Sequence, residues 1–201
     1  EFVKVKSGEL TLDAWMIKPI NFDASKKYPV IVEVYGEPGS STVQDVWGGG
    51  DLWNQYMANL GYIVVSIDNR GARAPRGREW RKCIYGEVGT FAAEDQARGV
   101  QDLAKQYSFI DPDRIGITGW SGGGSQTLNS MFRYPDVFKT GIAIAFVADQ
   151  KTYDTIYQER YMDTPQNNPE GYRKGSPISY ADGLQGNLSV SYTHLTLPTI
   201  R

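Results

Sequence analysis

The segment IGITGWSGGGSQTLN, residues 115–129, constrains the fold of this chain more than any other part of its sequence. A short apolar run ends at a serine that stands between glycines, and a helix-like pattern follows. Residues 119–123 match G-x-S-x-G, which is typical of a nucleophilic serine on a sharp turn between a strand and a helix. The glycines suit that turn, because side chains beside Ser121 would collide with the neighbouring strand and helix. The motif therefore predicts that Ser121 is a nucleophile.

Glycine-rich turns between a strand and a helix also bind phosphate, which is the main alternative for this motif. GWSGGGS, however, lacks the spacing of G-x-G-x-x-G and has no lysine for a P-loop. The nucleophile is therefore the stronger interpretation. Backbone N–H groups at the start of the following helix would also favour negative charge that develops beside Ser121.

Strands and helices are predicted to alternate along most of the chain. Residues 2–6 and 9–18 alternate apolar and polar residues around Ser7-Gly8, which predicts a hairpin. Residues 69–89, rich in Gly and Arg, are predicted to be a long loop. Buried strands are predicted at residues 28–36, 62–68, 114–120 and 140–147, and helices at residues 51–60, 91–107 and 125–134. This alternation indicates an α/β fold with a mostly parallel sheet and an antiparallel start.

Composition and charge argue against several classes of protein. The chain has 201 residues, of which 40% are hydrophobic and 22% charged, as in globular domains. A formal net charge of -2 does not favour nucleic acid as a partner, and acidic residues dilute the basic loop at residues 69–82. The longest apolar run, residues 141–148, is far shorter than the roughly 20 residues that cross a bilayer. One cysteine and one histidine offer no metal cluster, and no cofactor is expected.

Three segments, GWSGGGSQTLN, MFRYPDVFKTGIAIA and YDTIYQERYM, together resemble a known family. They are similar to the catalytic α/β-hydrolase domain of the prolyl oligopeptidase family of serine peptidases, specifically its dipeptidyl peptidase IV-like branch. The resemblance covers residues 30–188 and implies a peptide substrate and a β-propeller before this domain. We therefore expect residues 19–188 to be a partial α/β-hydrolase domain, truncated before its last strands. Residues 1–18 are expected to be its opening hairpin or the end of a preceding region.

The resemblance also implies how the oxyanion is held. Tyr35, in VEVYGEPGS, falls where the family places a tyrosine whose hydroxyl contacts the oxyanion. Its partner would be the backbone N–H of Gly122, the residue after the nucleophile, as the turn itself also predicts. From the residues alone, Tyr35 is better explained as an aromatic side chain that packs at a strand end.

A substrate pocket is implied in the same way. Tyr153 and Tyr157 fall where the family lines the pocket for the residue before the scissile bond, often proline, and Val147 would border it. Two aromatic residues four positions apart share one face of a helix, although such a pair is more often plain core. Two positions depart from relatives: many have an aromatic residue at Gly122, and others have proline at Phe146.

The general base and its acid partner are not evident. In this fold both follow the nucleophile, in the order Ser, acid, His. His194 is the only histidine, and the residues between Asp182 and His194 are too few for a βαβ unit of about 30 residues. We therefore expect that His194 is not the base. The final segment, SVSYTHLTLPTIR, resembles nothing in the family, so residues 189–201 are expected to be a non-native tail, with a divergent β-rich C-terminus as the alternative.

The sequence thus predicts a serine peptidase that releases short peptides, Xaa-Pro dipeptides among them, through an acyl-enzyme on Ser121. The chain alone is expected to be inactive without its acid and base. An esterase or acylaminoacyl-peptidase on the same fold is one alternative, and a non-catalytic binding protein is another. The compartment and oligomeric state stay open, and the resemblance is compatible with a periplasmic or exported protein and with a homodimer.

Overall fold

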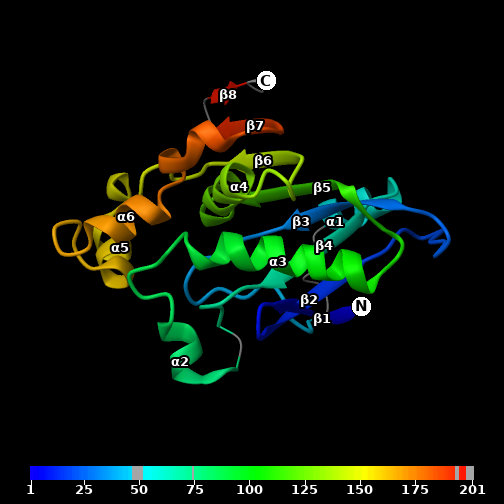
Figure 1. Cartoon of the computed structure of the whole chain (residues 1–201), viewed down its shortest axis with the longest axis horizontal. Coiled ribbons are helices and arrows are strands. Elements are labelled where there is room, and N and C mark those ends of the chain that lie inside the picture. The colour runs from blue at the N-terminus through cyan, green and yellow to red at the C-terminus, as the bar shows by residue number, and fades with distance from the viewer. Residues whose placement is uncertain (47–51, 74, 193–194, 198–201) are drawn as a thin grey trace.

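The structure is a computed structural model that describes residues 1–46, 52–73, 75–192 and 195–197. Over these residues the chain forms one sheet of eight strands with helices on both faces (Figure 1). The strands are β1 (Phe2–Ser7), β2 (Leu10–Ile17), β3 (Tyr28–Glu33), β4 (Ile63–Asp68), β5 (Ile110–Trp120), β6 (Thr140–Ile144), β7 (Asn187–Tyr192) and β8 (Leu195–Leu197). Their order across the sheet is β1-β2-β4-β3-β5-β6-β7-β8.

The pairing of the strands confirms the predicted sheet. β1 and β2 form an antiparallel hairpin, and β2 also pairs antiparallel with β4. From β4 through β3, β5 and β6 to β7, all neighbours are parallel. β8 pairs antiparallel with β7 at the far edge. The fold is therefore a mostly parallel α/β sheet with an antiparallel start.

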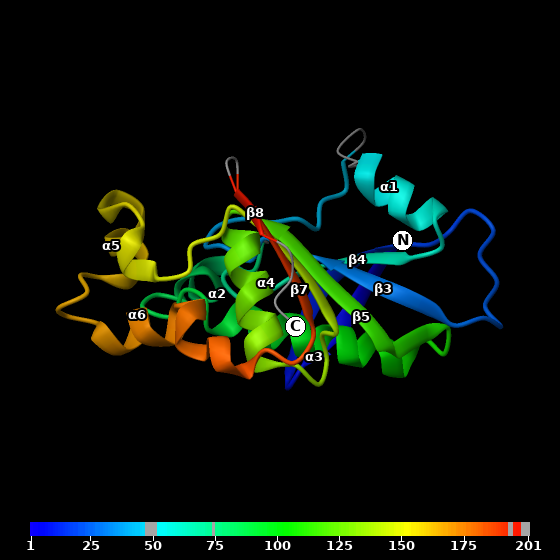
Figure 2. The ribbon, with the colours of Figure 1, turned by 90° about the horizontal axis from the view of Figure 1, so that it is seen from above.

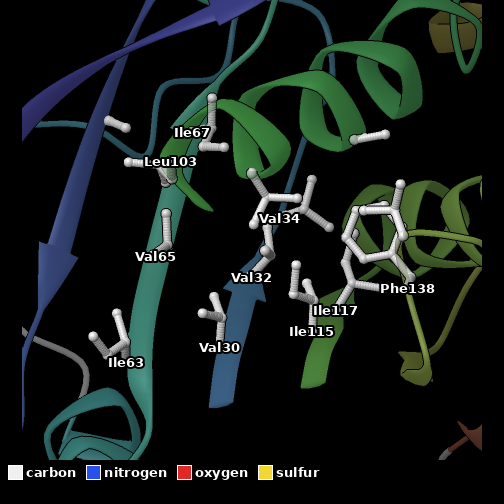
Figure 3. Packing of buried hydrophobic residues seen from close by; sticks show 14 of the residues in the cluster. Val30, Val32, Val34, Ile63, Val65, Ile67, Leu103, Ile115, Ile117 and Phe138 are labelled. Atoms are coloured by element: carbon white, nitrogen blue, oxygen red, sulfur yellow. The ribbon is translucent and has the colours of Figure 1, made fainter. Parts of the chain in front are cut away.

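The central strands form because they are short, apolar and rich in β-branched residues. Every residue of β4 is buried, whereas buried and partly buried residues alternate along β3. Successive side chains of a strand point to opposite faces, so residues two apart pack on the same side. Figure 3 shows this packing for Val30, Val32, Val34, Ile63, Val65, Ile67, Ile115 and Ile117, with Leu103 and Phe138 nearby.

The helices divide between the two faces of the sheet. The helices are α1 (Leu52–Asn59), α2 (Gly77–Lys82), α3 (Phe91–Gln106), α4 (Gly122–Arg133), α5 (Thr155–Met162) and α6 (Pro169–Gly175), with 3-10 turns at Gln150–Thr152 and Pro177–Gly183. Figure 2 shows α3 and α4 on one side of the sheet and α1 on the other. α2 corrects the prediction of a loop throughout residues 69–89. None of its six residues is buried, so it carries no apolar pattern that would indicate a helix.

The loops that follow three neighbouring strands meet at one edge of the sheet. Beyond β3, the N–H of Val34 donates to the carbonyl of Thr118 in β5 at 2.9 Å. Beyond β5, the N–H of Ser121 donates to the carbonyl of Ile144 in β6 at 2.8 Å. In open α/β sheets, ligands bind outside the carboxyl ends of the strands. This edge is therefore where a site is expected.

Strand β7 crosses the domain boundary predicted at residue 188. Leu188 pairs with Gly141 of β6, and Val190 pairs with Ala143 in the same parallel register. The hydroxyl of Tyr192 donates to the carbonyl of Phe146 at 2.8 Å, and the two rings lie 4.9 Å apart. Residues 189–192 therefore pack on the hydrolase sheet. The non-native origin of residues 189–201 stays a prediction, and His194 lies outside the described residues.

Candidate active site

Ser121 occupies a strained turn between β5 and α4. Its backbone has a φ of 56° and a ψ of -119°, a region that residues with a side chain rarely adopt. Two backbone hydrogen bonds hold it: the Ser121 N–H donates to Ile144, and the Ser121 carbonyl accepts from the N–H of Ser125 at 3.1 Å. Such strain persists only where the surroundings fix it, and it concentrates at functional sites. The geometry is that of a nucleophile elbow.

Two glycines allow this turn to pack against the neighbouring strand. A Cβ atom at Gly123 would lie 2.1 Å from the carbonyl oxygen of Val34, and one at Gly119 would lie 2.4 Å from the same oxygen. Both distances are far below a van der Waals contact, so a side chain at either position would push α4 and β5 away from β3. The fold therefore contains the steric restriction that the motif predicted, and the two glycines avoid the collision.

Tyr35 lies at the end of β3, directly beside the turn. Burial raises the pKa of the Tyr35 hydroxyl, and the charge of Glu37 raises it further, whereas hydrogen bonding with the Ser121 side chain acts in the opposite direction. The hydroxyl therefore stays protonated at neutral pH and available as a donor. Tyr35 is 39% exposed and lines the pocket that also contains Ser121. A neutral donor beside a nucleophile is suited to binding an oxyanion.

A small pocket of about 50 Å³ contains all the predicted site residues. We call it the Ser121 pocket. It is lined by Tyr35, Glu37, Ser121, Gly122, Ser125, Val147, Gln150, Tyr153, Tyr157 and Gln158. Four of these residues, Glu37, Ser125, Gln150 and Gln158, were not predicted from the sequence. Their types are common on protein surfaces, and only the folded chain brings them beside the serine.

Tyr153 and Tyr157 line the pocket together, but not from one helix as their spacing predicted. Tyr153 precedes α5, whose N-cap is Asp154. The Asp154 carboxylate accepts a 2.8 Å hydrogen bond from the Tyr157 N–H, which starts the helix between the two tyrosines. Their rings are perpendicular, with centroids 5.5 Å apart. This arrangement gives the pocket an aromatic side.

Val147 is fixed by the hydroxyl of Ser125. The Val147 N–H donates to Ser125 Oγ at 2.9 Å, and Ser125 Oγ donates to the Val147 carbonyl at 3.1 Å. Ser125 belongs to the first turn of α4, so the helix that follows Ser121 also holds the loop that follows β6. The pocket thus has an apolar border whose position is tied to that of Ser121.

Glu37 is the residue of the pocket that sequence analysis missed most clearly. It is only 8% exposed, and its carboxylate accepts a 2.6 Å hydrogen bond from the hydroxyl of Tyr157. Burial raises the pKa of Glu37, while the Tyr157 hydroxyl and the Gln126 side chain act in the opposite direction. Burial and the nearby Glu37 also raise the pKa of Tyr157. The one sequence signal was an acidic residue directly after the strand-end segment VYG.

Two further features are absent from the part of the chain that the structure describes. No group of three or more His, Cys, Asp or Glu residues there is arranged to hold a metal ion. Among the same residues, no helix combines the length and apolar character needed to cross a membrane. The described residues also include no histidine, because His194 lies outside them.

A serine on a strained strand-to-helix turn, at the carboxyl edge of a mostly parallel sheet, defines the active-site architecture of an α/β-hydrolase. The sequence profile of the Peptidase_S9 family, described as the prolyl oligopeptidase family, matches residues 51–197. The chain belongs to this family. The resemblance and the fold class predicted from the sequence are confirmed.

The relatives that the chain matches are dipeptidyl peptidases. A probable dipeptidyl-aminopeptidase B of Coccidioides posadasii is 43% identical over 178 residues, and dipeptidyl peptidase 8 of Mus musculus is 40% identical over 173. These alignments cover 88% and 86% of the chain but only 19% of each relative. The crystal structure of Porphyromonas gingivalis dipeptidyl peptidase 4 is 44% identical, with a TM-score of 0.90, over 96% of this chain and 27% of that one. The chain therefore spans about a fifth of the length of these curated relatives.

Proposed function

We propose that the protein containing this chain is a serine peptidase of the dipeptidyl peptidase type, with Ser121 as its nucleophile. The observation that carries the proposal is the convergence of Ser121, Tyr35 and Gly122 at one pocket, with the serine on a strained turn. The names of the relatives support a peptide as the substrate, with release of a dipeptide.

The proposed reaction begins when Ser121 Oγ attacks the carbonyl carbon of the scissile peptide bond. The serine proton passes to a general base, which we place outside the described residues because they include no histidine. The carbonyl oxygen becomes an oxyanion and accepts hydrogen bonds from the Tyr35 hydroxyl and the Gly122 N–H. The C–N bond then breaks, the amine leaves with a proton, and water releases the acyl group from Ser121. One oxyanion donor is typically worth about 3 kcal/mol in the transition state.

We propose that the residue before the scissile bond occupies the Ser121 pocket. The pocket is small, at about 50 Å³, and the perpendicular rings of Tyr153 and Tyr157 border it. A flat, compact ring such as that of proline would contact both aromatic faces. Val147 would supply an apolar contact on another side of the same pocket.

The test uses the protein expressed from the complete gene that encodes this chain. We expect a fluorophosphonate probe to label Ser121, and dipeptidyl Xaa-Pro anilides to be cleaved with release of the chromophore. The Ser121→Ala variant should show neither. Cleavage of aryl esters alone would show that the protein is an esterase and not a peptidase. A wild-type protein that the probe does not label would favour a binding protein without catalysis.

A further inference from the structure

Glu37 occupies the space in which residue 122 would carry a side chain. A Cβ atom built on Gly122 would lie 2.0 Å from Glu37 Cγ and 2.5 Å from both Cδ and Oε1. Atoms that are not bonded do not approach so closely, so residue 122 has to be glycine while Glu37 keeps this position. The carboxylate group thus forms the side of the Ser121 pocket next to the oxyanion donor.

Both ends of Glu37 are held in place. The Glu37 carbonyl accepts hydrogen bonds from the Ser40 N–H at 3.2 Å and from the Ser40 hydroxyl at 2.6 Å, which closes a turn in the loop after β3. At the other end, the Tyr157 hydroxyl donates to Glu37 Oε2 at 2.6 Å. A buried side chain whose backbone is fixed by a turn and whose carboxyl group is held by a hydrogen bond keeps one rotamer, and so a pocket that it borders keeps one size.

Resting on the proposed function, we propose that Glu37 is a specificity-determining residue that restricts the residue before the scissile bond to small side chains such as proline and alanine. It does so in two ways. Its side chain fills the volume beside Gly122, and its hydrogen bond fixes the ring of Tyr157 across the pocket.

The first experiment compares kcat/KM for Ala-Pro, Ala-Ala and Ala-Leu p-nitroanilides in the protein from the complete gene. In Glu37→Gly, kcat/KM for the leucine substrate divided by kcat/KM for the proline substrate should rise about ten-fold or more. The leucine side chain would no longer collide with Glu37, and a fit of this kind in an apolar pocket changes kcat/KM on this scale. Glu37→Gln is the matched control: it keeps the shape of the side chain, so the ratio should stay near the wild-type value. A ratio that Glu37→Gly leaves unchanged would overturn the proposal.

The second experiment tests the contact between Glu37 and Gly122 directly. Gly122→Ala should lower kcat/KM for the proline substrate about ten-fold or more, and the double variant Glu37→Gly with Gly122→Ala should recover most of that loss. A double variant in which the two single losses of kcat/KM simply add would contradict the proposal. If thermal melting shows that Glu37→Gly does not fold, Tyr157→Phe replaces it, since it removes the anchoring hydroxyl and should also raise the leucine-to-proline ratio.

Failure of the proposed function would be seen separately. A wild-type protein that cleaves aryl esters but no peptide would disprove the proposed peptidase activity. The size of the pocket could still be tested by comparing cleavage of acetyl and hexanoyl esters. In that case Glu37→Gly should raise the ratio of hexanoyl to acetyl cleavage, and an unchanged ratio would disprove the role of Glu37 as well.

Discussion

Tyr157 and Glu37 are 120 positions apart in the sequence, yet the Tyr157 hydroxyl donates a 2.6 Å hydrogen bond to the buried Glu37 carboxylate. This bond joins the loop after β3 to α5, so two sides of the Ser121 pocket are set by one contact. Tyr35 lies two residues before Glu37, and Tyr153 lies four before Tyr157. Tyr35, the proposed oxyanion donor, and the aromatic side of the pocket are therefore positioned together.

Tyr35→Phe should lower kcat on an Xaa-Pro anilide by a factor on the order of 10² to 10³, with a smaller change in KM, because the lost hydroxyl contacts the oxyanion rather than the bound peptide. Steady-state kinetics of the complete protein measure both constants. The side chain is 39% exposed, so the melting temperature should change little. An unchanged kcat would remove Tyr35 from the oxyanion site.

Ser121→Gly should be more stable than Ser121→Ala by about 1 kcal/mol, because glycine adopts the φ of 56° without the strain that alanine retains. Urea unfolding of the two variants measures the difference. Neither should react with a fluorophosphonate, whereas the exposed Ser179→Ala should be labelled like the wild type. Equal unfolding free energies would mean that the turn is not strained.

The buried Glu37 should make stability depend on pH. Burial raises its pKa in the folded state above the ordinary value of 4.5, so the folded protein holds a proton that the unfolded chain releases. The free energy of unfolding, relative to Glu37→Gln, should therefore be highest below about pH 4.5 and fall as pH rises from that value through the raised pKa. Urea titrations of both proteins across that range check the sign. A difference that rises with pH would contradict the cause given for the shift.

Asp95 should be among the most sensitive charged positions of the fold. It is fully buried, and it accepts hydrogen bonds from the Ser7 hydroxyl at 2.7 Å and from the N–H of Arg70 at 2.8 Å, as well as pairing with the Arg70 guanidinium. Asp95→Ala leaves the Ser7 hydroxyl and the Arg70 N–H without their acceptor and leaves the Arg70 guanidinium with Glu94 alone, at 2.7 Å, so it should cost about 3 kcal/mol.

Arg173→Ala is the control for this prediction. Its partner Glu170 lies three residues away on α6, and both side chains are more than half exposed, at 55% and 66%. Chemical denaturation should show little change in the free energy of unfolding for this variant, because solvent screens an exposed ion pair. Similar losses at both positions would argue against a structural role of the buried pair.

If the general base of Ser121 lies outside this chain, as we propose, the 201-residue chain expressed by itself should react with a fluorophosphonate far more slowly than the protein from the complete gene, on the order of 10⁴-fold. Time courses of labelling give both rates, with the Ser121→Ala chain as background. Equal rates would place a base within these residues and restore His194 as a candidate.

The strands and the sharp turn at Ser121 were predictable because their signals are local. β4 is a continuous apolar run, and the turn at Ser121 needs its glycines at fixed offsets from the serine. α2 was missed because none of its residues is buried, which leaves no apolar period to detect.

The polar part of the pocket was not predictable, because its residues acquire a role only through distant contacts. Glu37 becomes a pocket residue through Tyr157 and Gly122, and neither contact can be inferred from the segment around it. The spacing of Tyr153 and Tyr157 correctly predicted that the two rings lie close together, but it wrongly placed both residues on one helix. The helix begins between them at Asp154, and a cap depends on backbone geometry as much as on residue type.

The contact between Glu37 and Gly122 also limits the order in which the two positions can change during evolution. A side chain gained at residue 122 while Glu37 is present meets its Cγ at 2.0 Å, so that first step passes through a damaged enzyme. Loss of Glu37 first opens the space and leaves the glycine harmless. If Glu37 sets the pocket as proposed, a change to an aromatic residue after Ser121 is therefore expected to follow the loss of Glu37, through an intermediate with an enlarged and less selective pocket.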